Sequence, residues 1–286
     1  MQKWSTILES KVSEMSSSGN AAPQRPIQAA VCEVVFNRPL AGSYWHLSVA
    51  AITLAAAPGQ FFQLLCPGQG RGSHLLRRPM SIYRIDRTHG RMEFLYKVIG
   101  IGTRGLAGLV AGDALDLFGP LGRGFQLEPS WQHVILLGRG CGIATLAPLA
   151  EAASARGIAV TAVLSVARPE LAVSVDHLRA AGAEVTVVND VDGSAAPERI
   201  EALLRRLAAE RGSNLIAICG SNRLLQLVQR LGRELGIAGQ VALEQPMACG
   251  IGVCFCCVQP FAVGGRTEFR RVCHDGPVFD VQEALA

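Results

Sequence analysis

The chain has 286 residues, enough for about two domains and a small additional module. Its formal net charge is +4 and 17% of its residues are charged, so composition indicates neither a nucleic-acid partner nor a strongly acidic one. Since the sequence has no run of about 18 apolar residues, we expect no membrane span.

The N-terminal segment is polar and rich in serine from Met1 to Arg25. Glu9 and Glu14 interrupt any apolar core that a secretory signal would need. We expect residues 1–28 to form a flexible N-terminal extension, with one or two helical turns around residues 6–15. Because no signal is recognised and the number of cysteines is odd, at nine, we expect a reducing compartment and a cytoplasmic protein.

Residues 29–128 are predicted to form an antiparallel β-barrel or sandwich. Short apolar runs with β-branched or aromatic residues alternate here with glycine, proline and polar residues, as is typical of short strands joined by turns. No long helical pattern separates them. The predicted strands are 31–37, 44–50, 59–66, 80–86 and 91–98, with a hairpin turn at 88–90 and a short helix at 105–110.

Residues 129–238 show a different rhythm, in which buried strands alternate with amphipathic helices. This alternation predicts a parallel sheet with helices on both faces, as in nucleotide-binding α/β domains. Strands are predicted at 133–137, 159–165, 184–188 and 214–219. Helices are predicted at 145–155, 170–181, 197–210 and 223–235. Residues 239–286 differ in composition and form a third part.

Two glycine-containing motifs are candidate ligand sites, and a third is interpreted as a loop. The turn Gly138-Arg139-Gly140-Cys141-Gly142 follows a strand and opens a helix, so its amides would face a phosphate, although a tight turn without a ligand is the alternative. Gly100-Ile101-Gly102-Thr103 follows Tyr96-Lys97-Val98, and Thr103 could cap the next helix. Phe118 to Phe125 is interpreted as a loop that closes the barrel.

The segment Arg77-Arg78-Pro79-Met80-Ser81 opens a predicted barrel strand. An arginine can clamp a pyrophosphate, and a serine can hydrogen-bond the edge of a flavin ring. A solvated basic turn is the alternative interpretation of an Arg-Arg pair.

The cysteines near the C-terminus follow a spacing that is typical of iron–sulfur proteins. Cys249, Cys254 and Cys257 form C-x4-C-x2-C, and Cys273 lies farther on, as in plant-type [2Fe–2S] ligand sets. Structural zinc usually takes two C-x2–4-C knuckles, and only one is present here. Cys256 does not fit the ligand spacing and is interpreted as a residue that either is packed or supports the ligands without binding the metal. The remaining four cysteines are predicted to be small buried hydrophobes: Cys32, Cys66, Cys141 and Cys219.

Together these motifs resemble the ferredoxin–NAD(P)+ reductase superfamily over residues 29–279. More narrowly, the chain resembles the iron–sulfur flavoprotein electron-transfer subunits of bacterial dihydroorotate dehydrogenase B, which serve pyrimidine biosynthesis. The motifs that carry the resemblance are Arg78-Pro79-Met80-Ser81, Gly102-Thr103, Gly119-Pro120-Leu121-Gly122, Asp192-Gly193-Ser194, Glu244 to Cys257 and Arg271 to Phe279.

The resemblance implies an FAD/[2Fe–2S] oxidoreductase with three parts: an FAD-binding β-barrel at 29–128, an NAD(P)-binding-like α/β domain at 129–238 and a cluster module at 239–286. It implies a cluster held by Cys249, Cys254, Cys257 and Cys273, and a nicotinamide dinucleotide facing Gly138, Gly140 and Gly142. The implied FAD-binding residues are Arg78, Pro79, Met80, Ser81, Tyr96, Lys97, Val98, Gly102 and Thr103.

In such a hetero-oligomer, a separate FMN-type subunit oxidises the organic substrate, and electrons pass through the cluster to FAD and then to NAD+. The present chain would hold no catalytic residue for that substrate. A flavin can exchange two electrons with a nicotinamide and single electrons with a cluster, so FAD can link the other two implied cofactors.

Two departures from the family pattern concern the nicotinamide. Arg139 and Cys141 interrupt the glycine-rich turn, and Ser221-Asn222 follow Cys219-Gly220 where proline is common. The choice between NAD and NADP stays open, because Arg168 could either meet a 2′-phosphate or be surface charge. Two other functions also stay open. One is a self-contained NAD(P)H reductase that serves an oxygenase, ferredoxin or other acceptor, and the second is a non-enzymatic zinc module.

Overall fold

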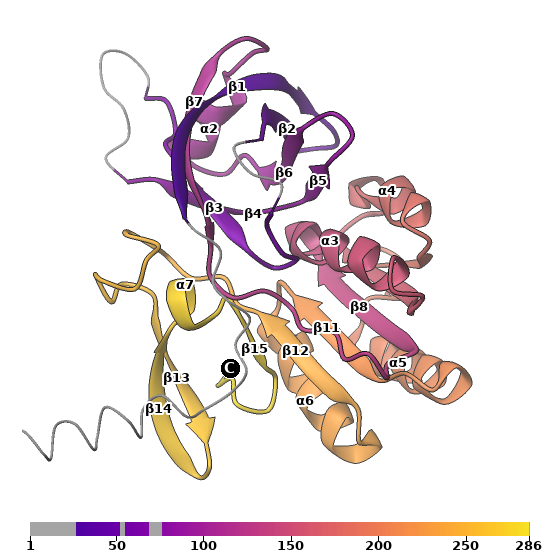
Figure 1. The fold of residues 1–286 in the computed structure, drawn as a ribbon. Coiled ribbons are helices and arrows are strands. Elements are labelled where there is room, and N and C mark those ends of the chain that lie inside the picture. The colour runs from indigo at the N-terminus through magenta and orange to yellow at the C-terminus, as the bar shows by residue number, and fades with distance from the viewer. Residues whose placement is uncertain (1–26, 52–54, 69–75, 286) are drawn as a thin grey trace, which may run out of the picture.

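The computed structural model describes residues 27–51, 55–68 and 76–285. These residues form a curled antiparallel sheet, a second sheet flanked by helices, and a small C-terminal hairpin (Figure 1). The predicted fold class is therefore confirmed. Most of the predicted N-terminal extension, including the helical turns expected around residues 6–15, lies outside the described residues.

The first sheet has seven strands in the order β4-β3-β7-β1-β2-β6-β5, and every pair is antiparallel. Alternate residues of a strand face opposite sides, and the inward-facing ones fill the barrel with apolar side chains such as Val34, Leu47 and Phe94. The strands are β1 (Gln28–Pro39), β2 (Tyr44–Ala50), β3 (Phe61–Leu64), β4 (Arg78–Ser81), β5 (Arg84–Asp86), β6 (Arg91–Lys97) and β7 (Ala114–Leu121).

Three features of the barrel differ from the sequence prediction. Residues 80–86 do not form one strand, because Ile82 and Tyr83 separate β4 from β5. The predicted loop at 118–125 begins inside β7, where Gly119 lies so close to Phe62 that a Cβ would approach the ring to 2.5 Å. The short helix α2 (Ile101–Ala107) begins at Ile101 instead of Gly105.

The second sheet has the order β10-β9-β8-β11-β12-β15. Its first five strands are parallel, and β15 pairs with β12 in the antiparallel sense. The predicted parallel sheet therefore carries one antiparallel edge strand. Its strands are β8 (His133–Arg139), β9 (Ala159–Val166), β10 (Glu184–Asn189), β11 (Leu215–Cys219), β12 (Ala238–Ala242) and β15 (Val278–Asp280).

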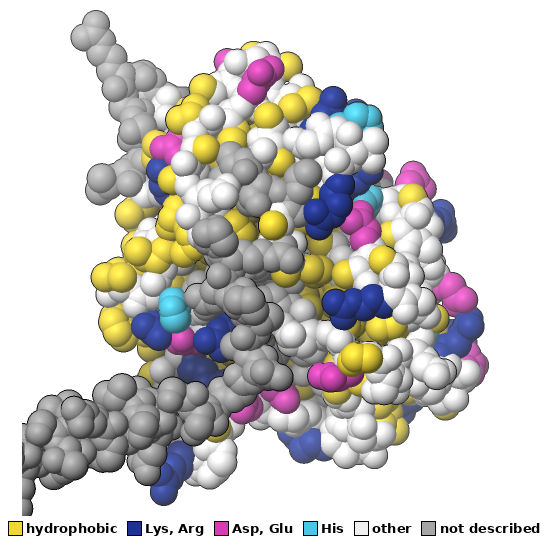
Figure 2. Space-filling model, viewed as in Figure 1, with side chains coloured by type: hydrophobic (Ala, Val, Ile, Leu, Met, Phe, Trp, Pro, Cys, Tyr) yellow, Lys and Arg dark blue, Asp and Glu magenta, His cyan; other side chains and the backbone are white. Residues whose placement is uncertain are grey.

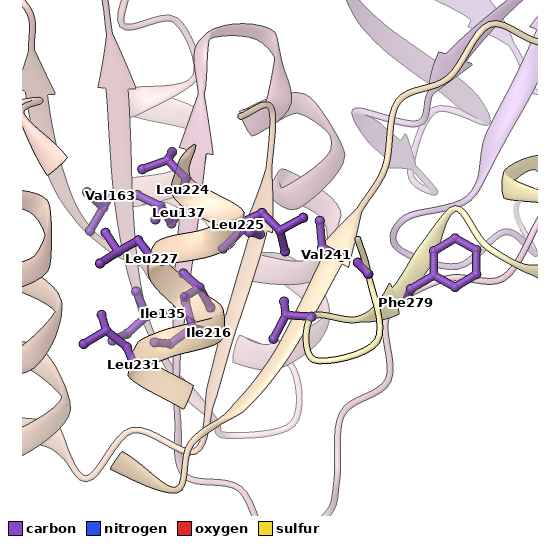
Figure 3. Close-up of a cluster of buried hydrophobic side chains, with 14 of the residues drawn as sticks. Ile135, Leu137, Val163, Ile216, Leu224, Leu225, Leu227, Leu231, Val241 and Phe279 are labelled. Carbon is purple, nitrogen blue, oxygen red and sulfur yellow. The ribbon is translucent and has the colours of Figure 1, made fainter. Parts of the chain in front are cut away.

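Helices cover both faces of this sheet. On one face α3 (Ile143–Ser154) and α4 (Val175–Ala180) bury their apolar side chains, and α3 also contacts β5 and β6 of the barrel. On the other face lie α5 (Pro197–Arg211) and α6 (Asn222–Leu235); Leu225 and Leu231 of α6 pack on Ile135 and Ile216 of the strands (Figure 3).

The predicted helix at 170–181 is divided in two. A 3-10 turn spans Pro169–Leu171, and α4 begins only at Val175. Ser174, just before α4, has a left-handed φ of 80°, a conformation that interrupts a right-handed helix. The helical part that remains is six residues long.

The C-terminal part packs against the second sheet and contributes its edge strand, β15. The hairpin of β13 (Val258–Val263) and β14 (Arg266–Arg271) leads to a helical turn, α7 (Val272–Asp275), and then to β15. Phe261 and Phe279 stack at 4.4 Å between ring centroids, within the same buried cluster as the strands and α6. No helix in the described ranges is long and apolar enough to cross a membrane.

Candidate functional site

A cleft of about 690 Å³ opens between the barrel and the second sheet. This volume lies within the range of about 300–1,000 Å³ that is usual for small-molecule and cofactor sites. Its walls come from β4, the end of β6, the loop that leads into α2, the start of α3 and the segment after β12. All the predicted FAD-binding residues except Val98 line it: Arg78, Pro79, Met80, Ser81, Tyr96, Lys97, Gly102 and Thr103.

Arg78 and Gly102 are placed against each other in this wall. A Cβ on Gly102 would lie 3.0 Å from Nε of Arg78, so glycine lets the α2 loop approach the guanidinium. The Arg78 side chain donates to the carbonyl oxygen of Leu76 at 2.7 Å and forms no ion pair with another described residue. Its charge is thus available to an anion in the cleft.

Thr103 organises the loop before α2. Its Oγ1 accepts hydrogen bonds from the amides of Ile99 at 3.0 Å and Gly100 at 3.1 Å. Thr103 is therefore not the cap residue that the sequence predicted: Gly100 is the cap, and Thr103 lies in the first turn, where its side chain accepts a bond from the Gly100 amide. The bonds hold the loop in the shape that forms one wall of the cleft.

The aromatic and polar residues of β4 and β6 have defined partners. Tyr96 donates to Oδ1 of Asn37 at 3.0 Å, so its hydroxyl is engaged inside the barrel. Thr145 of α3 donates to Oγ of Ser81 at 2.9 Å, which joins the two walls of the cleft. Val98 packs against the barrel core and is not part of the lining.

The glycine-rich turn after β8 is required by close packing. A Cβ on Gly138 would lie 2.9 Å from Cα of Ile143, and one on Gly142 would lie 2.5 Å from the carbonyl oxygen of Cys219. Gly140 has a φ of +55°. Gly138 and Gly142 therefore let β8, α3 and β11 approach one another, while Cys141 between them faces the cleft. Burial raises the pKa of the Cys141 thiol to about 12.

Arg139 lies across the carboxyl ends of three neighbouring strands. Its guanidinium donates to Ser165, near the end of β9, at 2.8 Å and to both carboxylate oxygens of Asp190, just after β10, at 3.2 and 2.7 Å. The hydrogen bond from Arg139 is the main cause that lowers the pKa of Asp190. Nearby, Arg168 pairs with Glu170 at 3.0 Å. Both arginines at this edge are thus paired with carboxylates.

The four predicted cluster ligands occupy one small region, linked by amide-to-sulfur contacts. The amide of Cys254 donates to Sγ of Cys249 at 3.4 Å, and the amide of Cys273 donates to Sγ of Cys257 at 3.3 Å. Gly252 donates to Sγ of Cys273 at 3.2 Å. These contacts connect the loop that carries Cys249 and Cys254 with Cys257 and with Cys273, which lies 16 residues after Cys257.

The pKa values of two of these thiols, Cys249 and Cys273, are shifted in opposite directions. Burial disfavours a charged Cys249, but amide hydrogen bonds from Cys254 and Ile251 outweigh it and lower the pKa to about 6. Burial and the neighbouring Cys257 raise the pKa of Cys273 to about 12. The described residues contain no group of three His, Cys, Asp or Glu side chains arranged to hold a single metal ion. Four thiols gathered in one small region match the number of ligands that a two-iron group needs.

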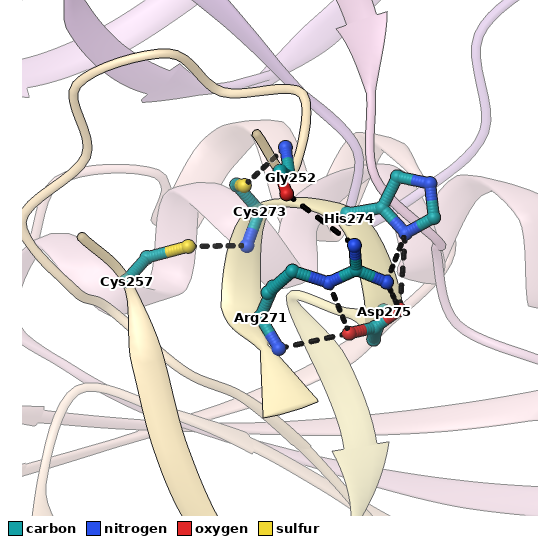
Figure 4. A network of polar contacts seen from close by, with 6 residues as sticks. All are labelled: Gly252, Cys257, Arg271, Cys273, His274 and Asp275. Atoms are coloured by element: carbon teal, nitrogen blue, oxygen red, sulfur yellow. Dashed lines mark hydrogen bonds and ion pairs between the residues drawn. The ribbon is translucent and has the colours of Figure 1, made fainter. Parts of the chain in front are cut away.

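The cysteine loop is shaped by glycine and anchored by an arginine. Gly250 and Gly252 have φ values of +75° and +81°, and a Cβ on Gly252 would lie 2.9 Å from Cβ of His274. Arg271 donates to both carboxylate oxygens of Asp275 at 3.0 Å and to the carbonyl oxygen of Gly252 at 3.3 Å (Figure 4). Arg271 thus ties the loop to the helical turn that carries Cys273.

The outer side of the loop exposes apolar side chains. Val253 is 70% exposed and Phe255 is 62% exposed, and Ile251 is also exposed. The space-filling view shows hydrophobic side chains gathered along the left side of the molecule (Figure 2). The Arg271 guanidinium carbon lies 5.8 Å from the ring centroid of Phe255. Exposed apolar groups that are concentrated on one loop indicate a contact surface.

The structure adds cleft residues that the sequence did not reveal. Cys141 and Thr145 come from the glycine-rich turn and α3, and residues 243–247 come from the segment after β12. Glu244 also approaches Cys219, whose Sγ lies 3.8 Å from its Oε1, while burial raises the pKa of Cys219 well above its usual value. These residues lie next to recognisable motifs in the sequence, which was a hint of their role. Only the tertiary structure, however, brings them together in one cleft.

Comparison with known proteins identifies relatives over most of the chain. The model of the iron–sulfur cluster binding domain of dihydroorotate dehydrogenase B matches residues 244–285. A Fusobacterium nucleatum protein named dihydroorotate dehydrogenase B (NAD(+)), electron transfer subunit, is 32% identical over 258 residues, covering 87% of this chain and 95% of that protein. A Listeria monocytogenes protein of the same name is 34% identical, covering 79% and 87%.

Solved structures show the same architecture. An NADH-dependent reduced ferredoxin-NADP oxidoreductase, described for flavin-based electron bifurcation, superposes with a TM-score of 0.74 at 26% identity, covering 93% of this chain and 91% of that one. A ferredoxin NADP+ reductase from Neisseria gonorrhoeae has a TM-score of 0.58 at 20% identity, covering 73% and 92%, and shows the likeness of fold alone. These matches confirm the resemblance expected from the sequence motifs.

Replacing Gly142 with alanine tests the packing at the turn. The added Cβ would overlap the carbonyl oxygen of Cys219, so we expect the free energy of unfolding to fall by about 1–3 kcal/mol. Gly108→Ala is the matched control, because its nearest neighbouring atom lies at an ordinary 3.4 Å. Denaturant unfolding measures both, and equal stabilities of the two variants would contradict this packing.

Proposed function

Because the chain belongs to the family of electron transfer subunits of dihydroorotate dehydrogenase B, we propose that it carries electrons between a nicotinamide and a separate catalytic subunit. One observation carries the proposal most directly. Residues 243–247 line the cleft, and Cys249 follows only two residues later. A flavin-sized cleft and a set of four thiols are thus joined by a very short stretch of chain.

The cleft is the proposed FAD site. When bound, FAD exchanges a hydride with a nicotinamide and single electrons with an iron–sulfur cluster. Arg78 would neutralise pyrophosphate charge, the loop held by Thr103 would present amides, and Ser81 with Thr145 would face the ring. The full proposed set comprises Arg78, Pro79, Met80, Ser81, Tyr96, Lys97, Val98, Gly102 and Thr103.

The cysteine loop is the proposed [2Fe–2S] site, with Cys249, Cys254, Cys257 and Cys273 as ligands. The backbone amides that point at these sulfurs would stabilise thiolate charge, and Gly250 and Gly252 give the loop its tight path. Cys256 points instead toward the carbonyl oxygen of Pro246, at 3.7 Å from its Sγ, and is not included.

The carboxyl edge of β8, β9 and β10 is the proposed nicotinamide-dinucleotide site, next to Gly138, Gly140 and Gly142. In doubly wound sheets a carboxylate at this edge binds the ribose hydroxyls of NAD, whereas a free arginine favours the 2′-phosphate of NADP. Here Arg139 and Arg168 are both paired with carboxylates. The names of the relatives, which specify NAD(+), agree with a preference for NAD.

The proposed partner is an FMN-type dihydroorotate dehydrogenase subunit, so the chain would act in a hetero-oligomer in pyrimidine biosynthesis, in the cytoplasm. The exposed apolar loop around Val253 and Phe255 supplies a contact surface beside the thiols. We further propose the divisions 29–128 for the FAD domain, 129–238 for the nucleotide domain and 239–286 for the cluster module, with 1–28 as an extension. The pairing of β12 with β11 would fasten the third part to the second, because all of β12 except its first residue lies within 239–286.

A second candidate function is an NAD(P)H reductase that serves a different acceptor. It is favoured by the likeness to the ferredoxin-NADP oxidoreductase of electron bifurcation, which extends over most of both chains. The acceptor protein distinguishes the two functions. Co-purification of the native protein with an FMN-containing dehydrogenase would support the first, and co-purification with a ferredoxin or oxygenase the second.

Cys254→Ser tests the separation of the two cofactor sites. Cys254 is exposed, so its loss leaves the packing of the barrel untouched, and we expect cluster iron and sulfide to be lost while FAD stays bound. Cys256→Ser is the matched control and should retain both. Iron analysis and the visible spectrum report the outcome; loss of FAD with retention of iron would refute the assignment.

Asp190→Asn tests the preference for NAD. Without the carboxylate, Arg139 is released to meet a 2′-phosphate, and we expect the ratio of kcat/KM for NADH over NADPH to fall about tenfold. Glu170→Gln, which frees the exposed Arg168, is the comparison variant and should change the ratio less. An unchanged ratio in Asp190→Asn would show that this carboxylate does not select the nucleotide.

Phe255→Glu tests the contact surface. A charge buried in an apolar interface is costly, so we expect the dissociation constant for the catalytic subunit to rise about tenfold or more. Val110→Glu is the matched control, because Val110 is 63% exposed but lies on the barrel beyond α2. Affinity is measured by calorimetry, and equal effects of the two variants would place the interface elsewhere.

A further inference from the structure

Gln63, in the middle of the short strand β3, is a fully buried amide without a hydrogen-bond partner. Its side chain is 0% exposed, and neither Nε2 nor Oε1 meets a partner among the described residues. Its neighbours Phe62 and Leu64 are also fully buried and apolar. An unpaired buried amide costs the desolvation energy of its polar atoms, so an apolar side chain would fit this position better unless a partner binds there.

The Gln63 side chain lies against the cysteine loop. A Cβ added to Gly250 would lie 2.9 Å from both Cγ and Nε2 of Gln63. Gly250 has a φ of +75° and directly follows the proposed ligand Cys249. Glycine at this position therefore lets the loop approach the amide closely, and Nε2 lies at the contact between the barrel and the loop.

Strand geometry places the amide on the cluster side of the barrel wall. Residues two apart on a strand face the same side, so Gln63 shares a face with Phe61. Phe61 belongs to the buried cluster that also contains Cys257, Cys273 and Leu121, while Phe62 belongs to the barrel core. Phe61 lines the flavin-sized cleft and Gln63 does not. The amide thus faces the thiols and not the cleft.

We propose that Nε2 of Gln63 donates a hydrogen bond to a sulfur of the [2Fe–2S] group held by the cysteine loop, and so acts as a positioning residue that raises its reduction potential. The proposal rests on the cluster site proposed above. A donor to a cluster sulfur stabilises the more negative, reduced state, which makes reduction easier. The bond satisfies Nε2 and leaves Oε1 without a protein partner.

The amide would add to a set of backbone donors. The amides of Ile251 and Cys254 donate to Sγ of Cys249, and those of Gly252 and Cys273 donate to the two buried thiols, Cys273 and Cys257 respectively. These donors all come from the C-terminal part. Gln63 comes from the barrel, so its bond would also couple the position of the cluster to the wall of the proposed FAD site.

The test replaces Gln63 with methionine, which has a similar shape and no donor, and with asparagine, which keeps an amide but shortens it. We expect both variants of the full-length, cluster-loaded chain to show a more negative midpoint potential in a redox titration followed by electron paramagnetic resonance. Loss of the cluster to a chelator should be about fivefold faster, as for one hydrogen bond.

Ser48→Ala is the matched control. Ser48 lies on β2, is 0% exposed, and its Oγ also has no partner among the described residues, but it lies in the barrel away from the loop. It should leave the potential and the rate of cluster loss unchanged. An unchanged potential in both Gln63 variants, or an equal shift in Ser48→Ala, overturns the proposal. A wild-type protein without a [2Fe–2S] signal overturns the cluster site itself, and this hydrogen bond with it.

Discussion

The strap formed by Gly276 and Pro277 holds the three parts of the molecule in one arrangement. The carbonyl oxygen of Gly276 accepts a hydrogen bond from the amide of Arg123 at 2.5 Å, at the end of the barrel. The carbonyl oxygen of Pro277 accepts one from the amide of Leu243 at 2.9 Å, at the edge of the second sheet. Gly122 makes room for this contact, since a Cβ there would lie 2.5 Å from the Gly276 oxygen. Cys273 lies only three residues before the strap, so the proposed cluster, the cleft and the sheet are fixed relative to one another.

Burial of the four proposed ligands is asymmetric, and this asymmetry suits an electron carrier. Cys257 and Cys273 are 2% and 1% exposed, whereas Cys254 is exposed and Cys249 is intermediate. The buried pair faces the core shared with Phe61 and Leu121 of the barrel. The other pair lies on the loop that carries the exposed apolar side chains. Cys257 and Cys273 would therefore hold the cluster on the side of the proposed flavin site, and Cys249 and Cys254 would hold it on the side where a partner would dock.

Local patterns in the sequence predicted the architecture, because the change from strands alone to alternating strands and helices is visible over short stretches. The C-x4-C-x2-C run is also local; the structure brings its cysteines and Cys273 into one small region, and their role as ligands stays a prediction. Strand β7 was not predicted from the sequence, because Gly119 and Pro120 are usual in loops. In the structure, Gly119 is needed where the strand passes close to Phe62. The pair of Arg139 with Asp190 joins residues that are 51 positions apart, so no local pattern reveals it. The same holds for Gln63, whose unusual character is visible only once its burial and its contact with Gly250 are known.

The central claim is that one chain joins a nicotinamide, a flavin and a one-electron cluster. Anaerobic titration of the purified protein with NADH, followed by visible absorption and electron paramagnetic resonance, tests it most directly. We predict flavin and iron–sulfur absorption before NADH is added, bleaching of the flavin bands by NADH, and the appearance of the signal of a reduced [2Fe–2S] cluster. A colourless protein that contains zinc, or a flavin that NADH reduces while the cluster stays oxidised at a potential where it should accept electrons, would contradict the account.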